Sequence, residues 1–401
     1  MAGGTTVDGG TAQGILAQAG DRARAGVRLF AAEGERVAAV CHTMANRFAA
    51  GGRLLALGGS PAARSDAHHV AVEFVHPVIV GKRALPALAV TATSGERGLV
   101  RRLEQLLRRD DIVIAFGAES DDGECACAVE LARRRGALTI GFGGSGGEFE
   151  FEPGVPDRYV RQELVETLYH VLWELVHVFF EHRGLLAGRT SRPLHDAGAS
   201  SFLYPFLAER EDNLERVLDD VRRSAVLKAQ EVGELRVQTL GENSQTLRHA
   251  AAALRARLHQ GGALLALGNG GSATDAMDVV ADLGAAGVRA IDLTEDPAIL
   301  TAIANDIGTE AIFARQVIAY GGPGDALLAL STSGNSANVI AALEEGRRRG
   351  LHTIAMVGYD GGRIAAEGLA DHVVVTRSEH IPRIQEAQAS AYHVLIDLVC
   401  R

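Results

Sequence analysis

A run of hydroxyl side chains is the strongest sign of chemistry in this sequence. The segment STSGNSANV, residues 331–339, follows an apolar run and supplies four hydroxyls beside a glycine: Ser331, Thr332, Ser333 and Ser336. Hydroxyls and the free N–H groups at a helix start can hold a phosphate, each charge-assisted hydrogen bond contributing about 1.5–3 kcal/mol. A serine-rich turn that only caps a helix is the plainer interpretation. Because the loop has no basic residue, we expect a sugar phosphate rather than a nucleotide.

A glycine turn earlier in the chain has the same strand–turn–helix pattern. It lies in LALGNGGSATDAMDVVADL, residues 265–283. The positive end of the helix that follows attracts an anion. We therefore expect three residues of this turn to help hold the phosphate: Asn269, Gly270 and Ser272. The same helix carries three aspartates, of which Asp275 is expected to be structural.

The chain repeats itself in order, which indicates a duplicated domain. GGRLLALGGS at 51–60 recurs as GGALLALGNGGS at 261–272, with an offset of 210 at the shared LLALG. ARRRGALTIGFGG at 132–144 is echoed by GRRRGLHTIAMVG at 346–358. Ordered pairs of this kind favour two tandem copies over a solenoid. In the first copy, GAESDD at 117–122 replaces the hydroxyl loop, and its carboxylates would repel a phosphate dianion.

Matching the two copies brings further candidate residues together. The helix after the first glycine turn has His69 and Glu73 where the second copy has Asp278 and Asp282. A histidine and a glutamate four residues apart share one helix face, and this spacing suits two ligands of one metal ion.

The closing helix of each copy carries a Gln-x7-His pair. The pairs are Gln162 with His170 and Gln385 with His393. Their members would lie about 12 Å apart along an ideal helix, so both reach one ion only by stretching or across subunits. Each histidine taken alone is more simply a hydrogen-bonded core residue. Because the pair occurs in both copies, we favour a functional role.

The elements that would position these residues predict an α/β fold. Apolar runs such as DIVIAFG and DALLALS alternate with helical segments, which indicates a parallel sheet covered on both faces. We expect two tandem αβα sandwiches, entered by long helical regions at about 17–50 and 207–259. The expected domains are a disordered tail at 1–16, a degenerate domain at 17–190 and a second domain at 207–401.

Composition narrows the class of protein. Hydrophobic residues make up 47% and charged residues 22% of the chain, as in ordinary globular proteins. Fifty acidic residues against forty basic ones give a net charge of −10, so nucleic acid is not the expected partner. No apolar run is long enough for a membrane helix, and the N-terminus does not resemble a signal peptide. The scattered cysteines predict neither a disulfide nor a zinc site. We expect a cytoplasmic protein.

Several motifs of the second copy together resemble the sugar isomerase (SIS) domain, and within it the phosphoheptose isomerase family. They are GNGGSATDAM, ANDIGTEAIFARQV, STSGNSANVI, VGYDGG and RIQEAQ, and the resemblance covers nearly all of 207–401. The first copy resembles the family more faintly. The resemblance implies a five-stranded parallel sheet in each copy, assembly through the long helices and active sites shared between subunits. It also implies interconversion of ketose and aldose phosphates.

The resemblance also implies metal ligands. Some members of the family place zinc on a His-x3-Glu pair and a Gln-x7-His pair. The possible zinc ligands in this sequence are therefore His69, Glu73, Gln162 and His170. No nucleotide cofactor is expected.

Catalytic roles follow from the same resemblance. The family uses a carboxylate on the helix after the glycine turn and a histidine on the last helix. The carboxylate would be Glu73 in a composite site or Asp282 in a local one, with His170 or His393 as the partner acid. Two further residues are expected to contact substrate: Asp306 and Gln385.

Two departures bear on the choice of sugar. Pro382 stands where the family has an acidic residue, and the family's basic stretch is shortened to GAAGVRA, which leaves Arg289 as the nearest cation.

The leading hypothesis is an isomerase for a sedoheptulose 7-phosphate-like sugar, acting through an enediolate. The fused chain would form a homodimer, a pseudo-tetramer of SIS domains. The alternatives are a non-catalytic SIS protein that senses a sugar phosphate or scaffolds another protein, and a weak isomerase with an architectural first copy.

Overall fold

The chain folds into two compact units. A computed structural model describes residues 10–77, 82–91, 97–117, 123–181, 186 and 213–401. The N-terminal unit is Ala25–Gln230, and the C-terminal unit joins Glu231–Arg401 with the described residues up to Arg24. The units divide inside two long helices, α1 (Ala12–Ala49) and α7 (Leu214–Glu242), which contribute residues to both. Of the domain boundary that the sequence predicts near 185–205, only residue 186 is among the described residues.

The N-terminal unit contains five strands and the helices between them. The strands are β1 (Leu54–Gly58), β2 (Ala87–Thr91), β3 (Ile112–Phe116), β4 (Leu138–Phe142) and β5 (Phe149–Phe151). Besides its parts of α1 and α7, its helices are α2 (Pro61–Val75), α3 (Gly98–Leu106), α4 (Glu124–Arg134) and α5 (Arg158–Glu181). Helix α2 begins where the Ser60 hydroxyl accepts a hydrogen bond from the N–H of Ala63.

The C-terminal unit repeats this plan with more helices. Its strands are β6 (Leu264–Leu267), β7 (Ala290–Asp292), β8 (Ala326–Ser331), β9 (His352–Gly358) and β10 (His372–Thr376). Its helices are α8 (Ser244–His259), α9 (Gly271–Ala285), α10 (Pro297–Asp306), the 3-10 turn η2 (Thr309–Ala311), α11 (Ala314–Tyr320), α12 (Ala337–Arg348), α13 (Gly362–Ala366) and α14 (Ile381–Cys400).

Both sheets confirm the predicted duplication. The strand orders are β2-β1-β3-β4-β5 and β7-β6-β8-β9-β10, and all strand pairs are parallel. An aspartate before the middle strand fixes the register in each: Asp111 accepts the N–H of Arg53 at 3.0 Å, and Asp325 accepts that of Ala263 at 2.8 Å. The fold is therefore the expected pair of five-stranded αβα sandwiches.

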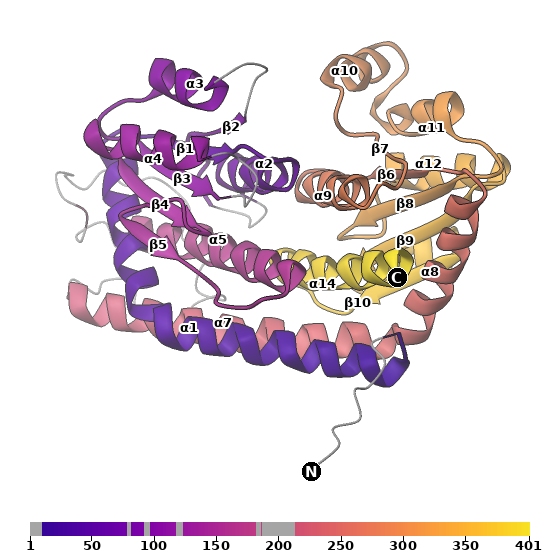
Figure 1. The fold of residues 1–401 in the computed structure, drawn as a ribbon, viewed down its shortest axis with the longest axis horizontal. Helices are drawn as coiled ribbons and strands as arrows, with labels where there is room; N and C mark the ends of the chain where they lie inside the picture. The colour runs from indigo at the N-terminus through magenta and orange to yellow at the C-terminus, as the bar shows by residue number, and fades with distance from the viewer. Residues whose placement is uncertain (1–9, 78–81, 92–96, 118–122, 182–185, 187–212) are drawn as a thin grey trace. The chain divides into compact units, whose positions relative to one another are not determined.

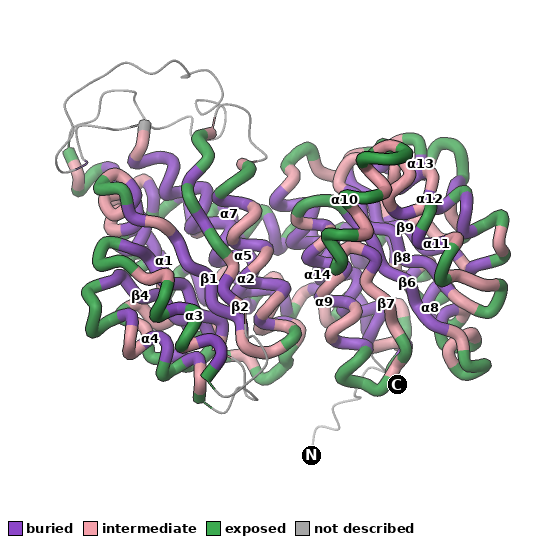
Figure 2. Tube along the Cα trace, turned by 90° about the horizontal axis from the view of Figure 1, so that it is seen from above, coloured by how far each residue is buried: buried purple, intermediate pink, exposed green. Residues whose placement is uncertain are grey.

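Helices cover both faces of each sheet, which explains the nearly unbroken apolar strands. In the N-terminal unit, α3 and α4 pack on one face, and α2 and α5 pack on the other with parts of α1 and α7 (Figure 1). In the C-terminal unit, α11 and α12 share a core with one face of the sheet, while α14 contacts α8 and α9. Strands β1, β3, β4 and β8 are buried along their whole length (Figure 2).

Four local features differ from the sequence-based expectation. Helix α1 begins at Ala12, so part of the expected tail at 1–16 is helical. The expected helix at 207–259 is broken at Asn243 into α7 and α8. The three-residue strand β5 is too short to give a clear apolar signal. The N-terminal unit has only the loop 143–148 where the C-terminal unit places α13. Among the described residues, no helix is long and apolar enough to cross a membrane.

Candidate functional site

A buried group of two carboxylates and an imidazole lies inside the C-terminal unit. Asp278 and Asp282 are on α9, and His393 is on α14. His393 Nε2 lies 3.4 Å from Asp278 Oδ2 and 3.7 Å from Asp282 Oδ2. We call these residues the C-terminal triad. Their possible ligand atoms all lie within 4.8 Å of one another, so the group could share a proton or hold a cation.

The N-terminal unit has a matching group at the same place in its fold. His69 is on α2, and Glu166 and His170 are on α5. His69 Nε2 lies 3.2 Å from His170 Nε2, and all three residues are buried. We call them the N-terminal triad. Burial first, and then the neighbouring His170, hold the pKa of His69 well below its usual value of 6.5, so its imidazole is neutral.

A tyrosine orients one member of each triad. The Tyr169 hydroxyl lies 3.0 Å from His69 Nδ1 and also donates to Asp66 at 3.4 Å. In the other unit, the Tyr392 hydroxyl donates to Asp278 Oδ2 at 3.0 Å. Asp66 lies beyond the first turn of its helix, so it supports this network rather than capping the helix.

Glu166 was missed by the sequence analysis. It is buried one turn before His170 on α5, so the two side chains share a helix face. The Glu-x3-His spacing was a usable signal, but the second copy has Ala389 at the matched position, so comparing the copies hid it. Of the other expected metal ligands, Glu73 is buried on α2, and Gln162 is only half-buried one turn before Glu166.

The hydroxyl-rich segment forms a compact turn between β8 and α12. Ser331 Oγ accepts the N–H of Gly334, and Ser333 Oγ accepts that of Asn335, both at 3.2 Å. Ser336 is the N-cap residue of α12, but its side chain makes no capping hydrogen bond. The hydroxyls of Thr332 and Ser336 are not used by the described part of the fold, so they are the ones open to a ligand.

A pair of side-chain amides joins the glycine turn before α9 to the start of α12, which follows the hydroxyl-rich turn. Asn269 Nδ2 donates to Asn338 Oδ1, and Asn338 Nδ2 donates back to Asn269 Oδ1, both at 2.9 Å. This reciprocal pair holds the start of α9 beside the start of α12. Asn269 therefore shapes the space between the turns, and Asn338 is a second residue that the sequence analysis missed.

Helix α13 supports the hydroxyl-rich turn from behind. The N–H groups of Ile364 and Arg363 donate to Gly334 O and Asn335 Oδ1. Gly334 has φ +63, and a Cβ there would approach Gly361 O to 2.2 Å, so only glycine fits. The loop 143–148 has no helix to offer such support.

In the N-terminal unit, that shorter loop is closed on itself. The Glu150 carboxylate accepts the N–H groups of the four residues from Gly144 to Gly147 at 2.8–3.2 Å. An internal carboxylate thus occupies a nest of backbone donors that would otherwise attract an anion. The segment GAESDD, which the sequence matches to the hydroxyl-rich turn, has residues 118–122 outside the described residues, so its expected repulsion of a phosphate stays a prediction.

Four other predicted residues have clear positions. Gly270 precedes α9 with φ +57, and Ser272 is buried in the first turn. Gln385 is buried on α14, and its Oε1 accepts no hydrogen bond within the described residues. Asp306 is exposed at the end of α10, where Asn305 Nδ2 donates to it at 2.8 Å, and no hydrogen bond links it to either turn.

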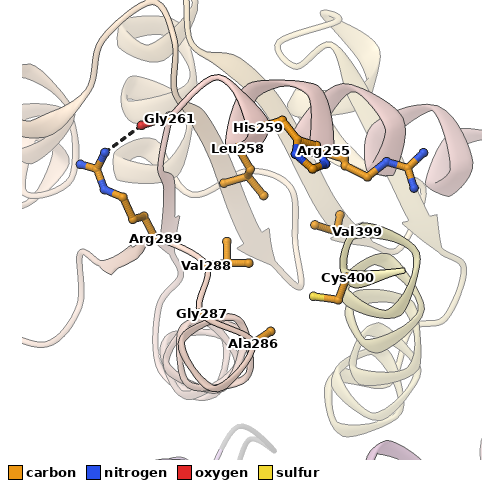
Figure 3. A pocket seen from close by; sticks show the side chains of 11 residues that line it. Arg255, Leu258, His259, Gly261, Ala286, Gly287, Val288, Arg289, Val399 and Cys400 are labelled. Carbon is orange, nitrogen blue, oxygen red and sulfur yellow. Dashed lines mark hydrogen bonds between the residues drawn. The ribbon is translucent and has the colours of Figure 1, made fainter.

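Arg289 does not lie at the phosphate turns. It donates to Gly261 O at 2.7 Å, before the first residue of β6, whereas both turns follow the carboxyl ends of their strands. It lines a cavity of about 380 Å³ formed also by Leu258, Val288 and Val399 (Figure 3). The sequence-based suggestion that Arg289 is the nearest cation is therefore wrong for the folded chain.

Comparison with known proteins agrees with this geometry. A family model described as "SIS domain" matches residues 229–358. The phosphoheptose isomerase of Chlorobium phaeobacteroides is 42% identical over 205 residues, which cover 49% of this chain and 86% of the relative. That of Geobacter sp. is 41% identical over 183 residues, 44% of this chain and 94% of the relative.

Solved structures extend the likeness over both units. The C-terminal domain of glucosamine-fructose-6-phosphate aminotransferase from Francisella tularensis has a TM-score of 0.59 and 8% identity, covering 97% of this chain and 94% of its own. Tagatose-6-phosphate ketose/aldose isomerase from Escherichia coli has a TM-score of 0.56 and 13% identity, covering 96% and 92%. At these identities the likeness concerns the fold alone.

Proposed function

Since this chain belongs to the phosphoheptose isomerase family, we propose that it isomerises a sugar phosphate, and that its C-terminal unit carries out the reaction. The preferred substrate class is a sedoheptulose 7-phosphate-like ketose. The protein would act in the cytoplasm as a homodimer, a pseudo-tetramer of SIS domains.

One observation carries this assignment to the C-terminal unit. Helix α9 begins at the glycine turn and carries Asp278 and Asp282 further along. At a rise of 1.5 Å per residue, they lie about 10 and 17 Å along the helix from Gly271. An extended sugar phosphate has its phosphate and its carbonyl at opposite ends. Phosphate-binding groups and acid–base groups separated along one helix fit such a substrate.

The phosphate would be held by hydroxyls and helix-start N–H groups. Thr332 and Ser336 would donate directly, and Ser331, Ser333 and Ser272 would shape the turns around them. Gly270 allows the backbone to approach closely, and Gln385 would offer its amide to the sugar hydroxyls. Neither turn contains a lysine or an arginine, so hydrogen bonds and the two helix dipoles would supply the attraction.

Proton transfer would use the C-terminal triad. Asp282 would take the proton next to the carbonyl, and the electrons of that C–H bond would form the enediolate. His393 would donate a proton to the carbonyl oxygen, while Asp278, held by Tyr392, keeps the imidazole in place. General acid–base groups of this kind contribute about 10²–10⁴-fold to a rate.

A metal ion bound near the carbonyl would polarise it and stabilise the negative charge of the enediolate. The residues that could hold zinc are those of the two triads, each with at least one imidazole and one carboxylate. The expected role of Glu73 and Gln162 as further ligands remains part of the proposal. No nucleotide cofactor is proposed.

Deuterium exchange tests the proposal directly. The protein is incubated with sedoheptulose 7-phosphate in D₂O, and deuterium next to the carbonyl is followed by NMR. Incorporation together with formation of the aldose supports the isomerase. Binding of the sugar phosphate without exchange would instead support a non-catalytic sensor or scaffold for this substrate.

A further inference from the structure

The cavity of about 380 Å³ beside Arg289 lies in the C-terminal unit, away from the phosphate turns. It is bounded by the last turn of α8, by the residues that follow α9 and by the last turn of α14 (Figure 3). Gly261 and Gly262, just before β6, also line it, whereas both phosphate turns follow the carboxyl ends of their strands. The cavity is therefore separate from the proposed substrate site. Its volume is at the lower end of the range for small-molecule sites.

The centre of the cavity is apolar. Leu258, Val288 and Val399 point into it from its three walls, and the sulfur of Cys400 also faces it (Figure 3). Filling this space with hydrocarbon would remove apolar surface from water on both sides of the contact. A ligand that fits the cavity therefore has an apolar part.

Two arginines at the rim determine the charge of that ligand. Arg255 makes no hydrogen bond or ion pair with any described residue, and within the described residues Arg289 donates only to Gly261 O. Their guanidinium groups lie on opposite sides of the cavity in Figure 3. Among the described residues that line the cavity, none is acidic. In a chain of net charge −10, this local excess of positive charge favours an anionic ligand.

The helix ends at the cavity do not reverse this preference. Three helices end there, and the carbonyls of a last helical turn carry partial negative charge. The chain itself already uses these acceptors in α8 and α9, because the N–H of Gly262 donates to Arg257 O and that of Val288 donates to Leu283 O. A cationic ligand would find those carbonyls occupied and would also face the two arginines.

We propose that this cavity binds a small organic anion with an apolar part, such as a medium-chain carboxylate, and that the bound ligand acts on the C-terminal triad. Helices α9 and α14 supply both the triad and walls of the cavity. Ala286, at the wall, donates its N–H to Asp282 O at 3.1 Å, and Val399 lies six residues after His393. A ligand wedged between these helix ends lengthens the 3.7 Å distance between Asp282 and His393. It therefore lowers kcat, a consequence that rests on the proposed isomerase function.

Calorimetry of the full-length protein with two matched probes, octanoate and octylammonium, tests the ligand class. We expect octanoate to bind at least about tenfold more tightly, because only its carboxylate pairs with the arginines. Arg255→Gln and Arg289→Gln should each weaken octanoate binding several-fold. Arg248→Gln, the control, changes an exposed residue of α8 outside the cavity and should leave the affinity unchanged. Tighter binding of octylammonium, no binding of octanoate, or equal octanoate affinity in all three variants would overturn the proposal.

Thiol labelling locates the bound probe. Cys127 and Cys400 are both exposed, but only Cys400 lines the cavity. Octanoate should slow the alkylation of Cys400 by iodoacetamide several-fold and leave that of Cys127 unchanged, as measured by mass spectrometry of the two peptides. Val288→Trp, which fills the cavity, should remove the protection. Protection of both cysteines, or of neither, would overturn the location.

The effect on the triad is measured in two ways. Saturating octanoate should lower kcat for the isomerisation about fivefold in the wild type and have no effect in Val288→Trp. Hydrogen exchange of the α9 amides around Asp282 should also change when octanoate binds, whether or not a sugar is turned over. A chain without isomerase activity would contradict the proposed function and leave the binding, labelling and exchange results to decide the site. Bound octanoate that changes neither kcat nor exchange would overturn the action on the triad.

Discussion

At the scale of residues, the two units differ at two positions on equivalent helices where candidate catalytic groups lie. The N-terminal unit has a histidine and a glutamate, His69 and Glu73, where the C-terminal unit has Asp278 and Asp282. An aspartate is one methylene shorter than a glutamate, yet Asp282 Oδ2 still lies 3.7 Å from His393 Nε2. The shorter carboxylate therefore keeps contact with the imidazole, which a proton-transfer role needs.

Replacing the candidate base in each unit tests which unit supplies the catalytic carboxylate. We expect Asp282→Asn to lower kcat for the isomerisation by about 10²–10⁴-fold, because an amide cannot accept the proton. Glu73→Gln should change kcat by only a few-fold. Steady-state kinetics with the sugar phosphate measures both. A large loss in Glu73→Gln and none in Asp282→Asn would move the base to the N-terminal unit.

The amide pair between the turns makes a second prediction. Asn338→Ala should raise KM about tenfold, equivalent to about 1.4 kcal/mol, because Asn269 loses both hydrogen bonds that hold it between the two turns. The kcat value should change little, since neither amide reaches the triad. Gln238→Ala, which removes a surface amide bonded to Glu242, is the control. An equal fall in kcat would show that the pair does more than position the phosphate turns.

The sequence predicted part of this site and missed part of it. The Gln-x7-His pair that occurs in both copies singled out His170 and His393, and the family's His-x3-Glu pair singled out His69. Glu166 escaped because Ala389 matches it in the other copy, and Asn338 escaped because only the hydroxyl residues of its segment were singled out. Which side chains meet across two helices depends on packing, and a single sequence does not specify that.

At the scale of elements, the strands were predicted more accurately than the connections between them. Runs such as LLALG are buried on both faces, so their apolar pattern identifies them. The three residues of β5 are too few for such a pattern. The N-terminal unit has the glycine-rich loop 143–148 in place of α13, and the Glu150 carboxylate accepts the N–H groups of this loop. The sequence alone does not predict that interaction.

The aspartate that aligns the strands of the N-terminal unit should matter for stability. Burial alone would raise the pKa of Asp111, but hydrogen bonds from Arg53 and Arg108 outweigh it and hold the pKa below its usual value. We expect Asp111→Ala to lower the free energy of unfolding of this unit by about 2–3 kcal/mol, because buried donors lose their acceptor. Urea unfolding monitored by the fluorescence of Trp173, in the core of this unit, measures it. Exposed Asp110→Ala, which lies next to it, should cost less than 1 kcal/mol.

At the scale of the whole molecule, acidification should weaken the fold. His352 and His372 pack with ring centroids 5.0 Å apart. Burial is the main cause that lowers the pKa of His352, and Arg257 and His372 add to it. Burial and His249 lower the pKa of His372. Asp371 raises both pKa values, but not enough to cancel the lowering. The unfolded chain binds these protons near pH 6.5, and the folded chain binds them only at lower pH. The stability they contribute is therefore complete above pH 6.5 and is lost as the pH falls below it.

Thermal unfolding at pH 7.5 and pH 5.5 tests this dependence. We expect a lower Tm at pH 5.5, and a smaller difference in His372→Asn, which cannot take up the proton. Since His69 is also buried and neutral, it contributes in the same direction, and only the difference between wild type and variant isolates the pair on β9 and β10. An unchanged pH dependence in the variant would contradict the assignment.

The proposed homodimer could bury an apolar helix that the described residues cover only in part. Helix α10, with the sequence PAILTAIAND, has no buried residue, and Ile307 directly after it is 54% exposed. Such a surface is costly in water and is typical of an assembly interface. Light scattering after gel filtration should give twice the chain mass of 42.2 kDa. Ile307→Asp should shift the mass towards one chain, because a charge buried in an interface is costly. Leu88→Asp on β2, which changes an exposed residue outside the long helices, should leave the dimer intact. A wild-type mass of one chain would contradict the homodimer and leave α10 to another partner.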